Sequence, residues 1–342
     1  MFIDSGSKIV PMRSRLLTLS LFIALALLLV PTVLAHTPLN TGGEHGSLET
    51  AYVISNPTKS WASYRELHEA GEAEYFKVRL SEGERLRVSV FIPTSEDPGF
   101  TPVLFVMGPG LPSLGQAPEA LEVPEGYGVQ AVGGRRPERA EYEPFTPSSY
   151  FYTADYDVVV QAGGDYYFAV YAPSMGGRYG FAEGYREVFS VTEWLLIPFD
   201  VVGIHQWEGQ PLALILSPLA ACLVIGFALL LRGNRLHGGP SSYVGAAAGL
   251  LYIGGGLVTL LQMLIALSHA FSVSSFLTGI FVLFPLAFGI SILRLTLRGR
   301  PSKKGRMLFA VYGLMGLATW AGFLVGPALA FLMAMIPQSS TG

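Results

Sequence analysis

Two histidines, His36 and His45, have side chains with the chemistry to bind a metal ion. If a signal peptidase cleaves after Ala35, His36 becomes the N-terminal residue and offers one ion both its α-amino group and a ring nitrogen. His45 adds a third nitrogen if the Gly42-Gly43 segment folds back. Nitrogen ligands of this kind suit Cu(II). Copper binding at His36 and His45 is therefore one hypothesis; the alternative is that His36 merely follows a cleavage site and His45 is solvated.

Other residues that could do chemistry lack a recognisable pattern. The acidic groups do not have the alternating Asp/Asn and Gly spacing of a calcium loop, so a solvated acidic surface is favoured. These groups are Glu96-Asp97, Asp155 with Asp157, and Glu138 with Glu141 and Glu143. No HExxH, GxSxG or phosphate-loop motif occurs. Cys222 is the single cysteine, which excludes an intrachain disulfide. It lies in an apolar run, which argues against a cysteine nucleophile. The sequence thus favours a protein that is not an enzyme.

The composition divides the chain into two halves. Hydrophobic residues make up 51% and charged residues only 14% of the 342 residues, whereas soluble domains carry about 25% charged residues. Residues 36–208 hold 24 acidic and 11 basic residues, a net charge of -13, and residues 209–342 hold no Asp or Glu. We expect an acidic domain in water joined to a membrane domain. The acidic balance also argues against a nucleic-acid partner.

The first 35 residues are typical of an export signal. Basic residues precede an apolar run over 16–30, and small residues precede Ala35. This pattern predicts a cleavable signal peptide over residues 1–35. The run is also long enough to be an uncleaved membrane anchor.

Residues 36–187 are expected to form one β domain. Residues 36–55 are rich in Gly, Thr and Ser and are expected to be a loop, and after them several runs alternate between apolar and polar side chains as β-strands do. Residues 74–80 place Phe76, Val78 and Leu80 on one face, and residues 85–92 repeat the pattern after a Gly-containing turn, which predicts a hairpin. A second hairpin turn is expected at 163–165. Further strands are expected at 102–107, 127–132, 156–161, 166–171 and 178–182. The pattern predicts an all-β, extracytoplasmic antiparallel sandwich.

Several segments of this domain resemble the bacterial pre-peptidase C-terminal domain. They are Ser60-Trp61-Ala62-Ser63-Tyr64, residues 74–78, residues 83–90, residues 164–171 and residues 177–181. The resemblance covers about residues 50–185. It implies a jelly-roll-like β-sandwich that serves as an accessory or binding module rather than as a catalytic domain.

An interfacial linker and four membrane spans are expected after the sandwich. Trp194, Phe199 and Trp207 are mixed with aliphatic residues in the segment 188–210, as is typical of the membrane–water interface. The region 211–336 contains four apolar runs of at least 20 residues, at 212–231, 243–268, 271–293 and 307–336. Each is long enough to cross the bilayer, which predicts an all-α four-helix transmembrane bundle with an external tail at 337–342.

The basic residues predict the orientation of these spans. All eight Lys and Arg residues after residue 208 fall in the segments 232–242 and 294–306, which the positive-inside rule assigns to the cytoplasm. The β domain and the C-terminus are then extracytoplasmic. Small-residue spacings at Gly245/Gly249 and Gly322/Gly326 suit close helix packing, either within the bundle or with a membrane-protein partner or second copy.

These observations favour a non-enzymatic integral membrane protein of the cell envelope. Its external sandwich is expected to bind a ligand or protein, as a possible subunit of a membrane complex. The alternative is a copper-binding protein or metalloenzyme subunit that uses His36. The spans contain no charged residue, which argues against an ion-coupled transporter.

Overall fold

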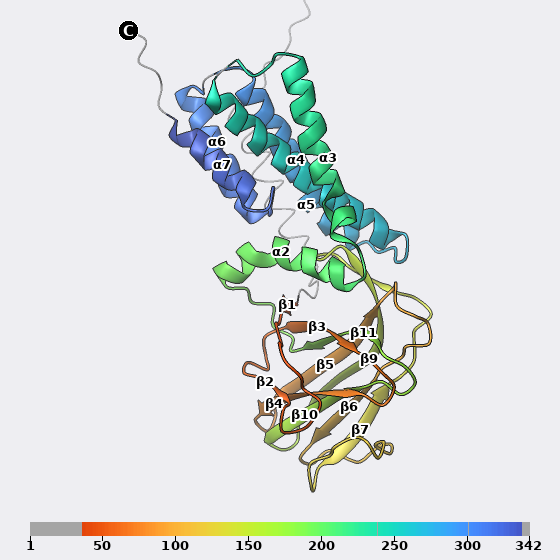
Figure 1. Cartoon of the computed structure of the whole chain (residues 1–342). Helices are drawn as coiled ribbons and strands as arrows, with labels where there is room; N and C mark the ends of the chain where they lie inside the picture. The colour runs from red at the N-terminus through yellow and green to blue at the C-terminus, as the bar shows by residue number, and fades with distance from the viewer. Residues whose placement is uncertain (1–35, 238, 300, 337–342) are drawn as a thin grey trace, which may run out of the picture. The chain divides into compact units, whose positions relative to one another are not determined.

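The computed structural model describes residues 36–237, 239–299 and 301–336. The predicted signal peptide at 1–35 and the tail at 337–342 lie outside the described residues. Eleven strands come first along the described chain (Figure 1): β1 Thr37–Pro38, β2 Tyr52–Ile54, β3 Trp61–Leu67, β4 Ala73–Leu80, β5 Arg85–Pro93, β6 Val103–Gly108, β7 Gly128–Gly133, β8 Glu141–Glu143, β9 Ser148–Val159, β10 Gly164–Tyr171 and β11 Gly177–Glu183.

The strands form two sheets that share one apolar core. One sheet has the order β1-β3-β11-β5-β9-β8 and the other β2-β4-β10-β6-β7. The pairs β1/β3 and β2/β4 are parallel and the remaining pairs are antiparallel. Phe76 of one sheet stacks on Phe181 of the other with ring centroids 4.0 Å apart. The predicted β-sandwich is therefore confirmed, but both sheets are mixed rather than wholly antiparallel as predicted.

The predicted faces of β4 and β5 are confirmed, but the predicted hairpin between them is wrong. Phe76, Val78 and Leu80 are buried, and Val88 is fully buried, whereas Arg85 is exposed. However, β4 pairs with β10 and β2, whereas β5 pairs with β11 and β9. The chain crosses between the sheets at the turn. Alternation identifies the buried face of each strand. The same alternation occurs whether two strands pair in one sheet or face each other across a core, so it could not predict the pairing.

The second predicted hairpin, at 163–165, is wrong for the same reason. It joins β9 of one sheet to β10 of the other. β9 also begins at Ser148 rather than at residue 156. The expected loop over 36–55 contains the two short strands β1 and β2, which add parallel edges to the two sheets.

The linker expected at 188–210 is mostly the helix α2, Val191–Trp207. Its start is fixed by a capping box, in which the Ser190 hydroxyl accepts from the Glu193 backbone N–H and the Glu193 carboxylate accepts from the Ser190 N–H. Such a cap satisfies two N–H groups that would otherwise lack partners. Pro198 lies within the helix and is buried.

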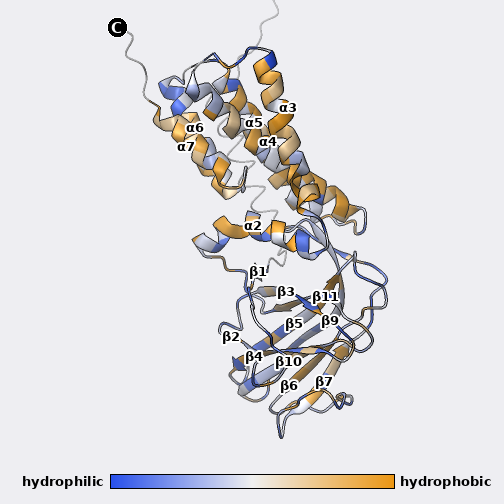
Figure 2. Cartoon of the chain, viewed as in Figure 1, coloured by the Kyte–Doolittle hydropathy of each residue, from blue (hydrophilic) through white to orange (hydrophobic). Residues whose placement is uncertain are grey.

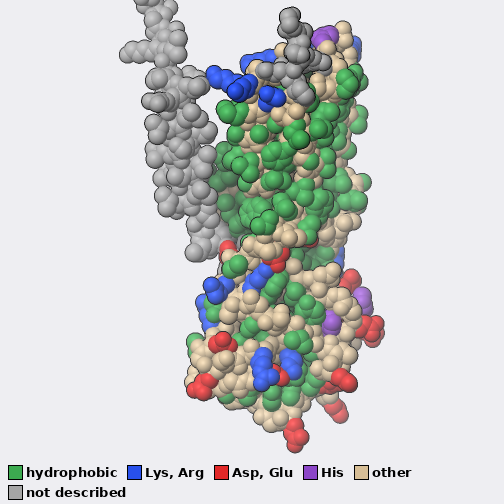
Figure 3. Space-filling view, turned by 90° about the vertical axis from the view of Figure 1, so that its left-hand side faces the viewer, with side chains coloured by type: hydrophobic (Ala, Val, Ile, Leu, Met, Phe, Trp, Pro, Cys, Tyr) green, Lys and Arg blue, Asp and Glu red, His purple; other side chains and the backbone are tan. Residues whose placement is uncertain are grey.

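Three helices of the second half are long and apolar enough to span a membrane. They are α3 Leu212–Arg232, α4 Pro240–Leu267 and α5 Ser275–Thr296. Figure 2 shows these helices largely in the hydrophobic colours, and Figure 3 shows hydrophobic side chains over much of the helical surface that faces the viewer. The first three predicted spans therefore correspond to membrane-length helices, which indicates a bilayer environment.

The fourth predicted span, 307–336, differs in the structure. It is not one helix but two, α6 Lys303–Ala318 and α7 Val325–Met335. They pack side by side in opposite directions (Figure 1), so that Gly313 of α6 faces the Phe331 ring of α7. The Arg306 guanidinium donates 3.3 Å to the carbonyl oxygen of Ile336. The end of α7 therefore lies beside the start of α6. A single span over 307–336 would instead place these two points at opposite ends of the bundle.

The turn between α6 and α7 is made by bulky residues in unusual conformations. Trp320, Phe323 and Leu324 have φ angles of 53°, 53° and 62°. A left-handed conformation costs a non-glycine residue about 1–2 kcal/mol. Contacts of the turn offset this cost, because the Trp320 ring stacks on Phe281 of α5 with centroids 4.6 Å apart.

Candidate functional site

His36 lies immediately before β1, against the sandwich. Its Nδ1 is 2.6 Å from the Ser60 hydroxyl oxygen. Burial, and then the nearby Arg87 guanidinium, lower the pKa of His36 to about 4. The ring is therefore neutral at pH 7, which is the form that binds metals.

His45 is held by different residues. Its Nδ1 lies 2.9 Å from the carbonyl oxygen of Thr50, and its Nε2 lies 2.7 Å from that of Thr41. Both ring nitrogens face hydrogen-bond acceptors, so a metal at His45 would have to replace one of these contacts. Within the described residues, no group of three or more His, Cys, Asp or Glu side chains is arranged to hold a metal ion. Copper binding at His36 and His45 stays a prediction.

One carboxylate in each of the three acidic groups considered for calcium has a partner within the protein. Glu96 pairs with Arg178 at 2.9 Å, and Asp157 pairs with Arg85 at 2.5 Å. The bonded Arg85 lowers the pKa of Asp157. The Glu143 carboxylate accepts from the Phe145 N–H at 3.2 Å, and burial raises its pKa to about 8. These contacts explain the three carboxylates without an ion.

A buried charged network lies under the loop that contains His45. Arg65 of β3 pairs with Glu74 of β4, and the Tyr179 hydroxyl donates to the same carboxylate. The Arg65 guanidinium also donates to the carbonyl oxygens of Thr41 at 3.1 Å and Gly43 at 3.0 Å. This network joins the two sheets and holds the loop 41–46 on the sandwich. Sequence reasoning missed it, since Arg65 and Glu74 lie on strands of different sheets and Tyr179 is distant from both in sequence.

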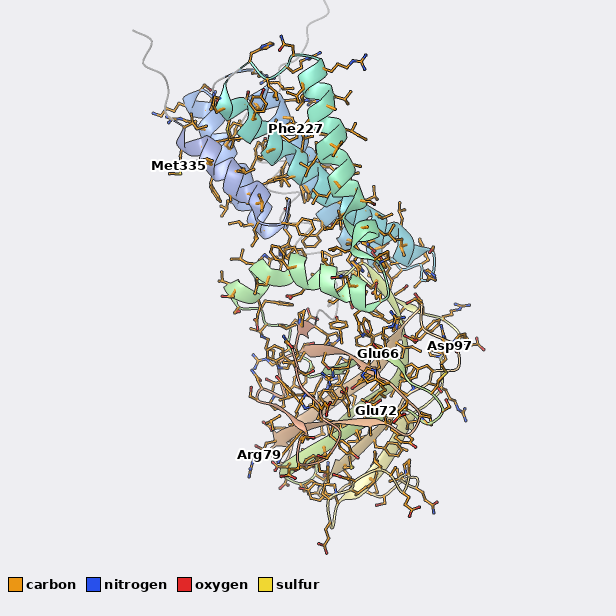
Figure 4. All side chains as sticks on the ribbon, viewed as in Figure 1. Glu66, Glu72, Arg79, Asp97, Phe227 and Met335 are labelled. Carbon is orange, nitrogen blue, oxygen red and sulfur yellow. The ribbon has the colours of Figure 1, made fainter. Side chains whose placement is uncertain are left out.

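Above this network is an open polar pocket of about 1030 Å³, its mouth included. Two of its carboxylates, Glu66 and Glu72, are labelled in Figure 4. Glu44 and Glu66 are exposed, whereas Glu72 accepts from the backbone N–H groups of His68 and Glu69. The full lining is Gly43, Glu44, His45, Gly46, Tyr64, Arg65, Glu66, His68, Glu72, Ala73, Glu74 and Trp207. Carboxylates outnumber the cations in it, so the pocket suits a cationic or hydrogen-bonding partner.

One end of α2 is bound to the sandwich beside this pocket. The Trp207 indole donates 2.9 Å to the carbonyl oxygen of Arg65, and its ring meets Tyr64 edge-on with centroids 5.0 Å apart. The Arg178 guanidinium in turn donates 2.9 Å to the Trp207 carbonyl oxygen. Near the other end, Lys59 and Glu193 form an ion pair of 2.6 Å.

The same helix also contacts the membrane-length helices. The Trp194 indole donates 3.3 Å to the carbonyl oxygen of Leu317 at the end of α6. The Trp320 indole donates 2.9 Å to the carbonyl oxygen of Trp194. Through Trp207 and Trp194, α2 thus contacts both halves of the described chain.

A second polar cluster, also missed in the sequence, lies at the C-terminal end of α2. His205 Nδ1 is 2.9 Å from a Glu208 oxygen, and the Tyr150 hydroxyl donates 3.0 Å to the other oxygen. Beside them Gln210 and Gln262 exchange two amide hydrogen bonds of 3.0 and 2.9 Å. The spacing of His205 and Glu208, three residues apart at a helix end, is the signal that could have revealed the pair.

The glycines singled out for helix packing contact other parts of this chain. A Cβ atom added to Gly249 would lie 2.7 Å from Leu293, and one on Gly245 would lie 2.3 Å from Thr296, both on α5. Gly326 of α7 faces the Tyr252 ring of α4, and Gly322 lies in the α6–α7 turn. Their close approaches therefore serve packing within the chain, and nothing described bears on a partner.

Comparison of the sequence with protein-family models and with curated proteins finds no match.

Proposed function

We propose that this chain is a non-enzymatic integral membrane protein of the cell envelope whose extracytoplasmic sandwich binds an external ligand or protein. The observation that supports this most is the polar pocket above the Arg65–Glu74 pair. The buried groups of the pocket are bonded to each other or to backbone, so they shape it, while Glu44 and Glu66 at the surface are free to meet a partner.

Binding is favoured over catalysis because of the roles these groups already have. Arg65 and Glu74 neutralise each other, and both nitrogens of His45 face carbonyl oxygens. None of them presents an activated nucleophile or base to the pocket. A rigid, acidic concave surface recognises a cationic group of a peptide or small molecule through charge complementarity.

The orientation is part of the proposal. The basic segments 232–242 and 294–306 are assigned to the cytoplasm, and the sandwich to the outside. Because Arg306 contacts the carbonyl of Ile336, we revise the expected external C-terminus and place the end of α7 on the cytoplasmic side. The jelly-roll-like module implied by the family resemblance is compatible with two sheets between which the chain crosses repeatedly, as from β4 to β5 and from β9 to β10.

The test is gentle purification of the full chain from its native membrane, followed by quantitative identification of what accompanies it. We expect an envelope protein or cationic ligand that is lost from the variants Glu44→Lys and Glu66→Lys. Glu119→Lys, an equal charge change at an exposed position outside the pocket, is the matched control. Equal recovery of the same partners with all three variants would refute binding at this pocket.

A further inference from the structure

A second, narrow pocket lies where α2 meets the membrane-length helices. It encloses a space of about 640 Å³, its mouth included. Its wall is mostly apolar, with Val202 of α2, Val258 of α4, Phe281 of α5 and Trp320 of the α6–α7 turn among its residues.

One buried polar atom in this pocket lacks a partner. His205 lines the pocket and is only 1% exposed, and its Nε2 makes no hydrogen bond to any described residue. An unsatisfied buried polar atom costs about 1–3 kcal/mol. By contrast, the hydroxyls of Thr259 and Thr278 in the same wall donate to the carbonyl oxygens of Gly255 and Pro144. The His205 ring is therefore the group that a ligand can satisfy.

The contact between Nδ1 of His205 and Glu208 fixes the role of one of the two ring nitrogens. A carboxylate only accepts, so the 2.9 Å contact with Glu208 requires a hydrogen on Nδ1 of His205. Nε2, on the other side of the ring, then needs a hydrogen-bond partner of its own, and an uncharged hydroxyl, which can both donate and accept, supplies one. No Lys or Arg is among the residues that line the pocket, and Glu208 lies behind the ring, so an anionic ligand would find no cation of its own.

From this geometry we infer that the pocket binds an uncharged lipid alcohol. Its hydroxyl forms a hydrogen bond with His205 Nε2, and its apolar chain lies along the carbon wall between α2, α4 and α5. Straight-chain and isoprenoid alcohols share this chemistry, and both partition into a bilayer beside the helices. The site is separate from the polar pocket of the sandwich and does not depend on the function proposed for that pocket.

The experiment uses the purified full chain in detergent and a photoreactive straight-chain alcohol. We expect saturable labelling of peptides from α2, α4 and the α6–α7 turn. The His205→Asn variant keeps an amide near the Nδ1 position to meet Glu208 but removes the Nε2 contact. It is expected to lower the affinity about tenfold, the effect of one buried hydrogen bond. His269→Asn, at an exposed histidine outside this pocket, is the matched control.

Two further arms separate the possible results. Thr259→Leu fills the pocket without touching the His205–Glu208 pair, and it should also weaken labelling if His205→Asn fails to fold. Comparing how well an isoprenoid alcohol and a straight-chain alcohol compete with the probe identifies which class of lipid alcohol the pocket prefers. The inference is overturned if the matching hydrocarbon or carboxylic acid competes as well as the alcohol. Unchanged labelling in both pocket variants, or labelling confined to exposed residues such as Val224, would overturn it equally.

Discussion

The indole nitrogen of Trp320 donates a 2.9 Å hydrogen bond to the backbone carbonyl oxygen of Trp194, and the two rings lie 4.6 Å apart. Trp194 belongs to α2, which is bound to the sandwich by Trp207, and Trp320 belongs to the turn that reverses the chain between α6 and α7. One pair of side chains therefore links the β domain, through α2, to the least regular part of the helical domain.

This relationship predicts graded effects of substitution at Trp320. Trp320→Phe keeps a ring against Phe281 but removes the N–H donor, so it should lower the free energy of unfolding by about 1 kcal/mol. Trp320→Ala also removes the ring and should lower it by about 3 kcal/mol. Thermal unfolding of the full chain in detergent measures both changes. Phe271→Ala, at a ring that is 86% exposed, is the control and should have little effect. Equal stability of all three variants would contradict a coupling role for this turn.

The reversal at residues 319–324 leads to a prediction about topology. With Cys222 replaced by Ala, cysteines are introduced singly at Lys304 and at Asp97 of the sandwich, and a tag is added after Gly342. We expect the tag and the cysteine at 304 to react with impermeant reagents only after the membrane is opened. The cysteine at 97 should react in intact cells. This result follows because Arg306 lies against Ile336. Access to the tag from the same side as residue 97 would instead support a single fourth span.

Local patterns in the sequence were sufficient for the faces of β4 and β5 and for the three long helices. Hydropathy could not detect the turn between α6 and α7, because Trp320, Ala321, Phe323 and Leu324 are all apolar. Gly322 lies in the turn and Pro327 just after it, but single residues of these types are also tolerated within membrane-spanning helices. The reversal depends on ring contacts with α2 and α5 that exist only in the folded chain.

The candidate sites were harder to predict for a related reason. His36 and His45 stand out in the sequence because cleavage after Ala35 would make His36 the N-terminal residue, but the structure gives them separate hydrogen-bond partners. The Arg65–Glu74 pair and the Tyr150–Glu208 contact join residues on different elements, and no spacing rule connects them. Only the pairing of the strands and the position of α2 bring these groups together.

A buried carboxyl at the end of β11 predicts how stability depends on pH. Glu183 is 1% exposed, neither of its oxygens has a hydrogen-bond partner among the described residues, and burial raises its pKa well above the usual range. The folded state therefore prefers the protonated form. Its contribution to stability is present at acidic pH and is lost as the pH rises from about 4.5 towards the raised pKa, by at most about 1.4 kcal/mol per pH unit.

The Glu183→Gln variant should remove this component of the pH dependence. We expect its unfolding free energy to exceed that of the unmodified protein increasingly as the pH rises, when both are measured by denaturant titration of the full chain. Glu82→Gln changes an exposed carboxyl in the turn before β5 and serves as the control. Parallel pH profiles for Glu183→Gln and the unmodified protein would show that the carboxyl is solvated or paired.

The Arg65–Glu74 pair should be the most costly ion pair in the sandwich to break. Its side chains are 17% and 8% exposed, and Glu74 also accepts from the Tyr179 hydroxyl. Glu74→Gln or Arg65→Met leaves one buried charge without its partner, which costs about 3–5 kcal/mol. Arg65→Met should also expose the loop 41–46 to proteases, because the guanidinium holds two of its carbonyl oxygens. Arg79→Met breaks a pair whose arginine is 84% exposed and should cost less than about 1 kcal/mol. If Arg65→Met and Arg79→Met unfold at the same temperature and resist the protease equally, the network does not hold the pocket together, and the shape proposed for the binding site loses its physical basis.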